Sequence, residues 1–471
     1  MKKICSTILL LALLFTHTRN IFAFDEEGEP ASDKSKEILL SGLIAGGETL
    51  LCNGIVMFSN ILYYKTTGKQ SWAIPTAESV KYNLTVPWEW EDTDDFIVNQ
   101  IGHPVQGALY YATGRVNGFG YYSSALFSAL GSVTFEAFGE ANKASFNDLV
   151  TTVTSSFSVG EMFYRLYLEA CAAGVPEFLA LAINPTAGVH RFLTGWEPPN
   201  YGRNLYQLSL QAGMGYAETS YSLEGNEGGF FSYKGFFPHL GVNIIYGNPF
   251  EQESRIPYEH FELSMSLGMN PGRYMNIRVF SDGYLFSLPA AYAGKGKMST
   301  GLSMHFDFVT LGKYDPGTST INQYSNALDW TIKYRELVSK DTAFEMKAHA
   351  GFTFMGAGAY YAPEAMDEFK NYGYGLNAKL FLNFEHRTLG RLEMNAFGYV
   401  IRTFPFPAVT HFSEGTAYWF FTDITYSYRL SKHISAGISG SFVIEHGIFN
   451  GGFPNTEKQN SEAKFFLAWN L

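Results

Sequence analysis

The sequence is poor in charge. Only 16% of its 471 residues are Asp, Glu, Lys or Arg, whereas a soluble domain has ~25%. Acidic residues outnumber basic ones by 44 to 33, which gives a formal net charge of −11. A nucleic-acid-binding chain needs a basic patch or stripe, so we expect no nucleic-acid partner. Aromatic residues contribute 17% and glycine 47 residues, a composition that favours β structure in contact with lipid.

Cysteine is also scarce, with three residues in the chain. Cys5 lies in an N-terminal segment where two lysines precede a short apolar run and the small residue Ala23 offers a cleavage point. This order is typical of a secretory signal peptide over residues 1–23. Its removal leaves Cys52 and Cys171, and the sequence alone does not bring their Cα atoms within disulfide distance. Their apolar helical surroundings favour two buried thiols.

From about residue 205 the chain alternates between apolar and polar residues, as in FELSMSL over 261–267 and LSMHFDF over 302–308. Such a period of two predicts strands. Twelve are expected, near 204–216, 236–247, 258–268, 274–288, 301–310, 327–336, 343–356, 373–386, 390–402, 417–430, 434–446 and 462–471. Several have the length that a tilted strand needs to cross a bilayer.

The predicted strands carry one apolar face and one face with Lys, Glu, Asp, Asn, His or Ser. A transmembrane barrel turns its apolar face to lipid and its polar face to the lumen. The even strand number and the aromatic residues near strand ends favour this arrangement. The last strand has Phe465, Leu467, Trp469 and Leu471 on one face, which resembles the C-terminal signal of bacterial outer-membrane barrels. We predict an antiparallel barrel of about 12 strands over residues 200–471; a large soluble β domain is the alternative.

The first half of the chain has helical periodicity instead. Helices are predicted near 75–82, 103–118, 121–141, 146–173 and 176–194. Two consecutive prolines at 198 and 199 mark the end of this part. We therefore predict an all-helical periplasmic domain over residues 24–199, which makes the fold class α plus β in separate domains.

One segment of the first half, residues 38–63, is apolar over a length sufficient to span a membrane. Glu48, Asn53 and Asn60 interrupt it. We interpret the segment as a buried amphipathic helix.

Four acids and one arginine occur within the apolar stretch 135–165. Glu136 and Glu140 are four residues apart and are predicted to share a helix face, where they repel unless a cation or proton intervenes. The candidate cations are Arg115, Arg165, Arg191, His103 and His190.

The following helix is predicted to carry a polar stripe. At ~100° per residue, Asn147, Thr154 and Glu161 fall near one line, and Arg165 follows Glu161 by four residues. Asp148 lies off this line. Its spacing from Ser145 is that of a helix N-cap, which is one role for it.

Three interpretations of these residues remain open. The first is a buried ion-pair network that holds the helices together. The second is an active site in which buried acids act as general acid or base, with Glu136, Glu140, Glu161 and His103 as candidates. The third is a metal site, which the spacing supports weakly because no HxxxH or ExxH pair is present. We expect no metal and no cofactor.

The helical part resembles a bacterial family known as domain of unknown function 3943, over roughly residues 70–196. The resemblance is carried by Asp94, Asp95, Phe96, Asn99, Gly102, His103, Pro104, Gly107, Tyr110, Tyr111, Arg115, Asn117, Gly118, Glu136, Gly139, Glu140, Asn147, Asp148, Thr152, Gly160, Glu161, Tyr164, Arg165, Asn184, Pro185 and Gly195. It implies a signal peptide and an outer-membrane location in bacteria with two membranes, and it implies no known activity. It also makes Asp148 part of a family motif, which capping alone would not require.

These observations lead to an outer-membrane barrel with a periplasmic helical domain. The leading hypothesis for its role is binding or passage of a small or amphiphilic molecule. An envelope enzyme acting on lipid or glycan through the buried glutamates is the second hypothesis, and a structural or assembly factor is the third. Expected partners are outer-membrane lipid, the barrel-assembly machinery during biogenesis, and a small ligand whose identity the sequence does not give.

Overall fold

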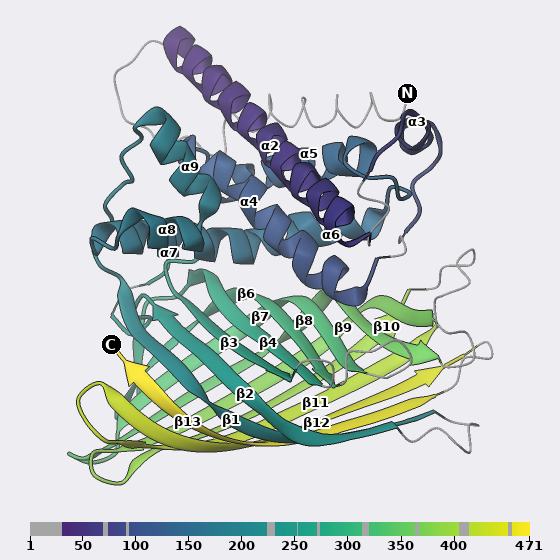
Figure 1. Ribbon diagram of the computed structural model, residues 1–471. Coiled ribbons are helices and arrows are strands. Elements are labelled where there is room, and N and C mark those ends of the chain that lie inside the picture. The colour runs from purple at the N-terminus through teal and green to yellow at the C-terminus, as the bar shows by residue number, and fades with distance from the viewer. Residues whose placement is uncertain are drawn as a thin grey trace. The chain divides into compact units, whose positions relative to one another are not determined.

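The computed structural model describes residues 31–68, 74–90, 94–223, 231–251, 253–270, 274–312, 320–362, 367–404, 414–450 and 455–471 (Figure 1). The predicted signal peptide lies outside these residues. The chain divides into two compact units, with the boundary between Arg203 and Asn204. The first unit is helical and the second is a closed barrel, so the predicted fold class is confirmed.

The helical unit contains eight α-helices and two π-helical turns in its described residues. The α-helices are α2 (Ala31–Thr67), α3 (Ala77–Thr85), α4 (His103–Val116), α5 (Tyr121–Phe138), α6 (Phe146–Ser155), α7 (Glu161–Ala172), α8 (Glu177–Ile183) and α9 (Pro185–Thr194). The π-helical turns are η3 (Val98–Gly102) and η4 (Ser156–Gly160). Helix α4 is central and packs against α2, α5, α6 and α9.

Two predicted helices are divided by local signals. The segment 146–173 is interrupted by the wider turn η4, which rotates α7 relative to α6, so that one straight stripe does not run along both. The segment 176–194 breaks at Asn184, whose side chain accepts a hydrogen bond from the Ala187 amide. Pro185 then begins α9, because its fixed φ and missing N–H suit the first helical turn.

The prediction that Glu136 and Glu140 share one helix face is wrong. Helix α5 ends at Phe138, and Gly139 is its C-cap. A Cβ on Gly139 would meet the Phe135 ring, which leaves room only for glycine at this close approach. Glu140 therefore follows the helix in irregular backbone.

The expectation that residues 38–63 form a buried helix is also wrong. Helix α2 is long and apolar enough to cross a membrane, and most of that apolar stretch is exposed. Leu43 and Phe58 are each 66% exposed, whereas Ala45 and Thr49 are fully buried. The helix thus packs against the unit by one narrow face.

The barrel consists of twelve long strands and one short one. They are β1 (Leu205–Leu223), β2 (Phe231–Tyr246), β3 (Phe261–Asn270), β4 (Tyr274–Ser287), β5 (Ala291–Ala293), β6 (Gly296–Gly312), β7 (Thr320–Leu337), β8 (Thr342–Ala362), β9 (Asp367–His386), β10 (Gly390–Thr403), β11 (Gly415–Arg429), β12 (Ile434–Phe449) and β13 (Thr456–Asn470). All twelve predicted strands are present. Several extend further than predicted, β8 by six residues at its C-terminal side, from 356 to 362.

Every neighbouring pair of strands is antiparallel, and the sheet closes on itself. Strand β1 pairs with β13 from Ser209 opposite Asn470 to Leu223 opposite Thr456. Strand β4 pairs with β6 past the short β5. Closure leaves no free sheet edge, which is the condition for a sheet to exist in hydrocarbon.

The side chains alternate across the barrel wall as predicted. On β11, Tyr418, Phe420 and Ile424 point outward and are 41–53% exposed, whereas Trp419 and Phe421 point inward and are buried. We call the end where β1 begins and β13 finishes the terminal end, and the opposite end the loop end. Connections at the terminal end include the short segments 338–341, 387–389 and 430–433 and the longer segment 247–260 between β2 and β3.

Candidate functional site

In the helical unit, Glu161 forms the centre of a buried ion cluster. Its carboxylate contacts the Arg115 guanidinium at 2.9 Å and the Arg165 guanidinium at 2.8 Å. The Tyr111 hydroxyl donates to it at 2.9 Å. Glu161 is the first residue of α7, directly after the π-helical turn η4, and turns of this kind are frequent at functional sites.

Burial and the neighbouring charges shift the pKa values of Tyr111 and Arg115 in this cluster. Burial, followed by the charge of Glu161, raises the pKa of Tyr111 well above its usual value. Burial opposes the charge of Arg115, but Glu161 and neighbouring tyrosines outweigh it and raise the pKa of that guanidinium. Glu161 thus faces two permanent cations, an arrangement suited to a structural ion pair rather than to a general acid.

A second buried cluster surrounds Asp148. Ser145 caps α6 by accepting from the Asp148 amide at 3.1 Å, and its hydroxyl donates to the Asp148 carboxylate at 2.5 Å. Asn147 donates to the same carboxylate at 3.0 Å, and His103 Nε2 lies 3.4 Å from it. The carboxylate of Glu136 accepts from the Ser145 amide at 2.8 Å. Asp148 therefore combines the capping role with contact to His103.

The remaining predicted residues lie apart from these clusters. Thr154 donates back to the Val150 carbonyl at 2.8 Å. Arg191 lies 3.9 Å from Glu197 and donates to Cys171 at 3.7 Å. Glu140 is buried. The sequence analysis placed these residues in one polar network. The structure divides them among the Glu161 cluster, the Asp148 cluster and the surface near Arg191.

Cys52 and Cys171 are free thiols, and each is partly exposed rather than fully buried as expected. Cys52 lies 3.8 Å from the Thr186 hydroxyl. Cys171 instead accepts from Arg191.

The barrel lumen holds a cavity of about 300 Å³ that reaches from mid-barrel to the terminal end. Polar residues from most strands line it, among them Gln207, Ser209, His239, Asn243, Glu262, Arg278, Glu345, Lys347, Lys379, Asn383, Arg391, Glu393, Asn395, Asp423, Ser427, Lys464 and Asn470. Acids and bases occur in nearly equal number. Its inner wall is aromatic: the rings of Phe280 and Phe381 lie 5.0 Å and 4.9 Å from that of Phe397.

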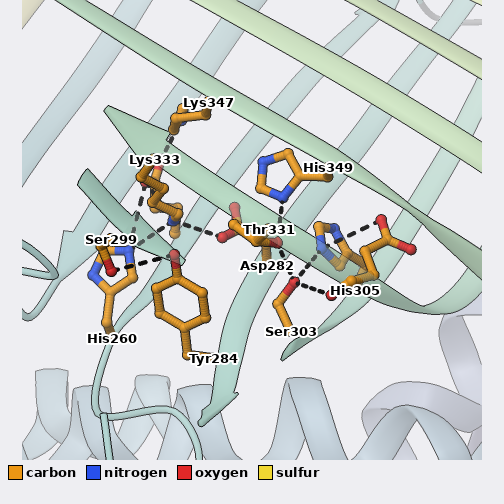
Figure 2. A network of polar contacts seen from close by, with 12 residues as sticks. His260, Asp282, Tyr284, Ser299, Ser303, His305, Thr331, Lys333, Lys347 and His349 are labelled. Atoms are coloured by element: carbon orange, nitrogen blue, oxygen red, sulfur yellow. Dashed lines mark hydrogen bonds and ion pairs between the residues drawn. The ribbon is translucent and has the colours of Figure 1, made fainter. Parts of the chain in front are cut away.

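One wall of the cavity is built around the buried ammonium of Lys333 on β7 (Figure 2). Its Nζ lies 2.7 Å from His260 Nε2, 2.8 Å from Glu262 and 2.8 Å from Asp282. These contacts use the three N–H groups of an ammonium. Lys347 on β8 also contacts Glu262. The bonds therefore join β3 and β4 to β7 and β8 across the lumen.

The same three ligand atoms could hold a metal ion, because they lie within 4.8 Å of one another. The Lys333 ammonium occupies the position that such an ion would take. The expectation of no metal stays a prediction.

A group of serine, histidine and aspartate lies beside this wall but does not have the geometry of a hydrolase. His305 Nε2 contacts both Ser303 at 2.8 Å and Asp329 at 3.4 Å, while the Lys379 ammonium donates to Nδ1 at 2.9 Å. A catalytic triad places the carboxylate on Nδ1 and leaves Nε2 free to accept the serine proton. Here Nδ1 is the acceptor, so Nε2 carries the proton and cannot activate Ser303.

The loop half of the lumen is filled with side chains. Lys379 pairs with Asp307, which also accepts from Tyr399 at 3.2 Å. Beyond this pair lies an apolar cluster that we call the plug, made of Val309, Leu311, Ile321, Phe397, Tyr399, Ile401, Ala417, Trp419, Phe421 and Val443. Lys458 and Glu445 form a further buried pair at 3.1 Å.

On the other wall, Glu462 of β13 binds Arg278 of β4 at 2.6 Å and Lys464 at 3.0 Å. The cavity is therefore bordered by cross-lumen ion pairs on two sides. Sequence reasoning missed these residues individually, since their only signal was that a strand's polar face carried full charges such as Lys333 and Asp282.

Solved barrels align with the second unit at low similarity. The translocator domain of autotransporter NalP from Neisseria meningitidis covers 57% of this chain and 88% of its own, at 10% identity and a TM-score of 0.25. An outer membrane channel from Pseudomonas putida F1 covers 57% of this chain and 99% of its own, at 7% identity and a TM-score of 0.26. The outer membrane protease OmpT from Escherichia coli covers 57% and 99%, at 10% identity and 0.21. Such values assign no activity, and no curated protein matches the chain.

The helical unit matches a described family. The model of Domain of unknown function (DUF3943) matches residues 87–185, a range that includes both the Glu161 and the Asp148 cluster. The predicted resemblance is confirmed: over residues 87–185 the chain is similar to the DUF3943 family, and a closed 12-stranded antiparallel barrel follows.

Proposed function

We propose that the chain is an outer-membrane barrel that binds a small polar solute in its lumen and passes it only when the plug moves. The observation that carries this proposal is the asymmetry of the lumen. A polar cavity of about 300 Å³ lies toward the terminal end, and the buried apolar plug lies toward the loop end. The nearly balanced charges of the lining favour a neutral or zwitterionic solute.

The outer surface of the barrel supports the membrane location. Large apolar side chains such as Leu376, Phe420 and Phe465 are 45–64% exposed on it, as lipid contact requires. A periplasmic terminal end is part of this proposal, because the chain enters β1 there from the helical unit.

The helical unit belongs on the same side of the membrane in this proposal, after export by the signal peptide. Its buried carboxylate clusters act in holding the helices together. Outer-membrane lipid surrounds the barrel, and the barrel-assembly machinery inserts it.

The test measures solute passage through full-length protein reconstituted in liposomes. Osmotic swelling in glycine and in a neutral monosaccharide reports permeation. Wild-type protein should swell slowly, because the plug blocks the lumen. The double variant Ile401→Ala/Trp419→Ala removes two buried plug side chains and should swell several times faster.

The matched control is Val400→Ala/Phe420→Ala, one residue along each of the same strands. These side chains are 42% and 45% exposed on the outer wall, so their loss should leave swelling at the wild-type rate. The proposal fails if wild-type protein is as permeable as an open pore, or if the plug variant, with heat-modifiable migration intact, swells no faster than the control.

A further inference from the structure

Helix α2 has the opposite polarity to a helix on the surface of a soluble protein. A soluble helix packs its apolar stripe on the core and turns polar residues to water. In α2 the packed face carries small and polar residues, and the exposed face carries large apolar ones. The exposed set is Ile38, Leu39, Leu40, Leu43, Ile44, Leu50, Leu51, Ile55, Phe58, Leu62 and Tyr63, each at least 42% exposed.

The packed face is held by polar contacts rather than by apolar packing. Thr49 bonds Thr113 of α4 at 2.8 Å. Asn53 donates to the Gly131 carbonyl at 2.9 Å and to Thr134 at 2.7 Å, both on α5. Glu48 lies 2.6 Å from His190 Nδ1 of α9. Polar side chains that bond across helices are typical of packing within membranes.

Two small residues lie where α2 faces its neighbours, at ordinary van der Waals distance for an added Cβ. Gly42 and Gly46 are four residues apart, and a Cβ on them would lie 3.6 Å from the Phe119 ring and 3.7 Å from Leu130. This spacing is also the one that membrane helices use at their interfaces. The packed face thus has the chemistry of a helix whose other side is in lipid.

The neighbouring helices extend the exposed apolar surface. Helix α9, which contacts α2 through His190 and Thr186, exposes Phe192 by 83% and Leu193 by 64%. Helix α8, packed on α9, exposes Phe178 by 70%. Many large apolar side chains exposed on one unit mark interaction or membrane sites, since single exposed residues would need no explanation.

We propose that the outward face of α2, with the exposed residues of α8 and α9, is immersed in the acyl region of a phospholipid bilayer. The occupant is lipid rather than a protein groove, because the face is convex helix surface along 33 residues, from Ser35 to Thr67. Its last turns add Tyr63, Tyr64 and Lys65, the residue types found where helices meet the headgroup region. Glu48, Thr49 and Asn53 stay hydrogen-bonded to the other helices of the unit.

The experiment uses full-length protein in phosphatidylethanolamine and phosphatidylglycerol vesicles, with Cys5, Cys52 and Cys171 replaced by serine. Single cysteines at Leu43 and Phe58 carry a fluorophore, and a fraction of the lipid has brominated acyl chains that quench only within the bilayer. Leu376→Cys on the barrel exterior is the positive control. Lys81→Cys on the exposed α3 is the aqueous control.

Labels at Leu43 and Phe58 should lose most of their fluorescence, as the label at Leu376 does, while the label at Lys81 should keep it. The proposal is overturned if both α2 labels behave like Lys81. The proposal is also overturned if neither bromolipid nor aqueous iodide quenches the α2 labels, or if these positions cross-link between two copies. Either result would mean that protein covers this face of α2. Two label positions guard against one variant that fails to fold.

Discussion

At the residue scale, Glu161 is the carboxylate that pairs with both arginines in the centre of the helical unit. Its carboxylate is fully buried between two guanidiniums. Glu161 and Arg165, four residues apart in the sequence, form an ion pair along one helix.

Glu161→Gln should destabilise the helical unit strongly. It leaves Arg115 and Arg165 buried without their counter-charge, and breaking a buried pair in this way costs ~3–5 kcal/mol. Thermal loss of the helical circular dichroism signal of the full chain measures it, with barrel migration on unheated gels as the folding check. Glu197→Gln, which removes an exposed partner of Arg191, should leave the midpoint unchanged. Equal midpoints for both variants would contradict a structural role for Glu161.

Lys333 is the residue whose ammonium holds His260, Glu262 and Asp282 together in the barrel. Lys333→Ala removes the ammonium and leaves His260, Glu262 and Asp282 facing one position. Because imidazole and carboxylates bind zinc, the variant should take up about one Zn²⁺ per chain, measured by metal analysis after dialysis. Wild-type protein and Lys333→Ala/His260→Ala should take up far less. Absence of zinc binding in the single variant would contradict this prediction.

At the element scale, the crossing of α4 and α6 depends on Gly107. A Cβ there would meet the backbone carbonyl of Thr152, which cannot move without shifting α6. Gly107→Ala should therefore lower helical-unit stability by ~1–3 kcal/mol. Gly102→Ala is the matched substitution, since its Cβ would lie 3.6 Å from Val98 and alanine favours helix by ~0.5–1 kcal/mol. The same thermal measurement should show opposite shifts, and a shared direction would contradict this account.

The elements differ in how far the sequence could predict them. Period-two alternation located all twelve long strands, because lumen and lipid impose opposite chemistry on alternate residues. It did not show that β8 continues to 362, where small and aromatic residues replace the alternation. For α2, the amino-acid composition predicted a helix but not which face is exposed. Its polar residues Glu48, Thr49 and Asn53 contact the other helices, and large apolar residues are exposed instead. The Lys333 site joins residues from β3, β4 and β7. Spacing within one strand does not predict which residues of different strands lie opposite each other, so the sequence did not predict this site.

At the scale of the whole molecule, the barrel closes entirely within the second unit. Both β1 and β13 lie in residues 204–471, so a fragment of these residues contains every pairing of the closed sheet. We expect it to refold in detergent with heat-modifiable migration. A fragment over 204–455, which lacks β13, should aggregate, because β1 and β12 then present open edges. Refolding of the shorter fragment alone, or failure of the longer one, would contradict this view.

The β1–β13 seam has a consequence for the time course of assembly. Ser209 pairs with Asn470, and Leu223 with Thr456. One edge of β1, the first strand of the barrel, therefore stays unpaired until β13, the last strand, has been synthesised. Pairings so distant along the chain carry a high loop-closure cost and form slowly. A newly made copy therefore passes through a period in which one edge of β1 is unpaired, and the length of this period depends on how quickly β13 pairs with it.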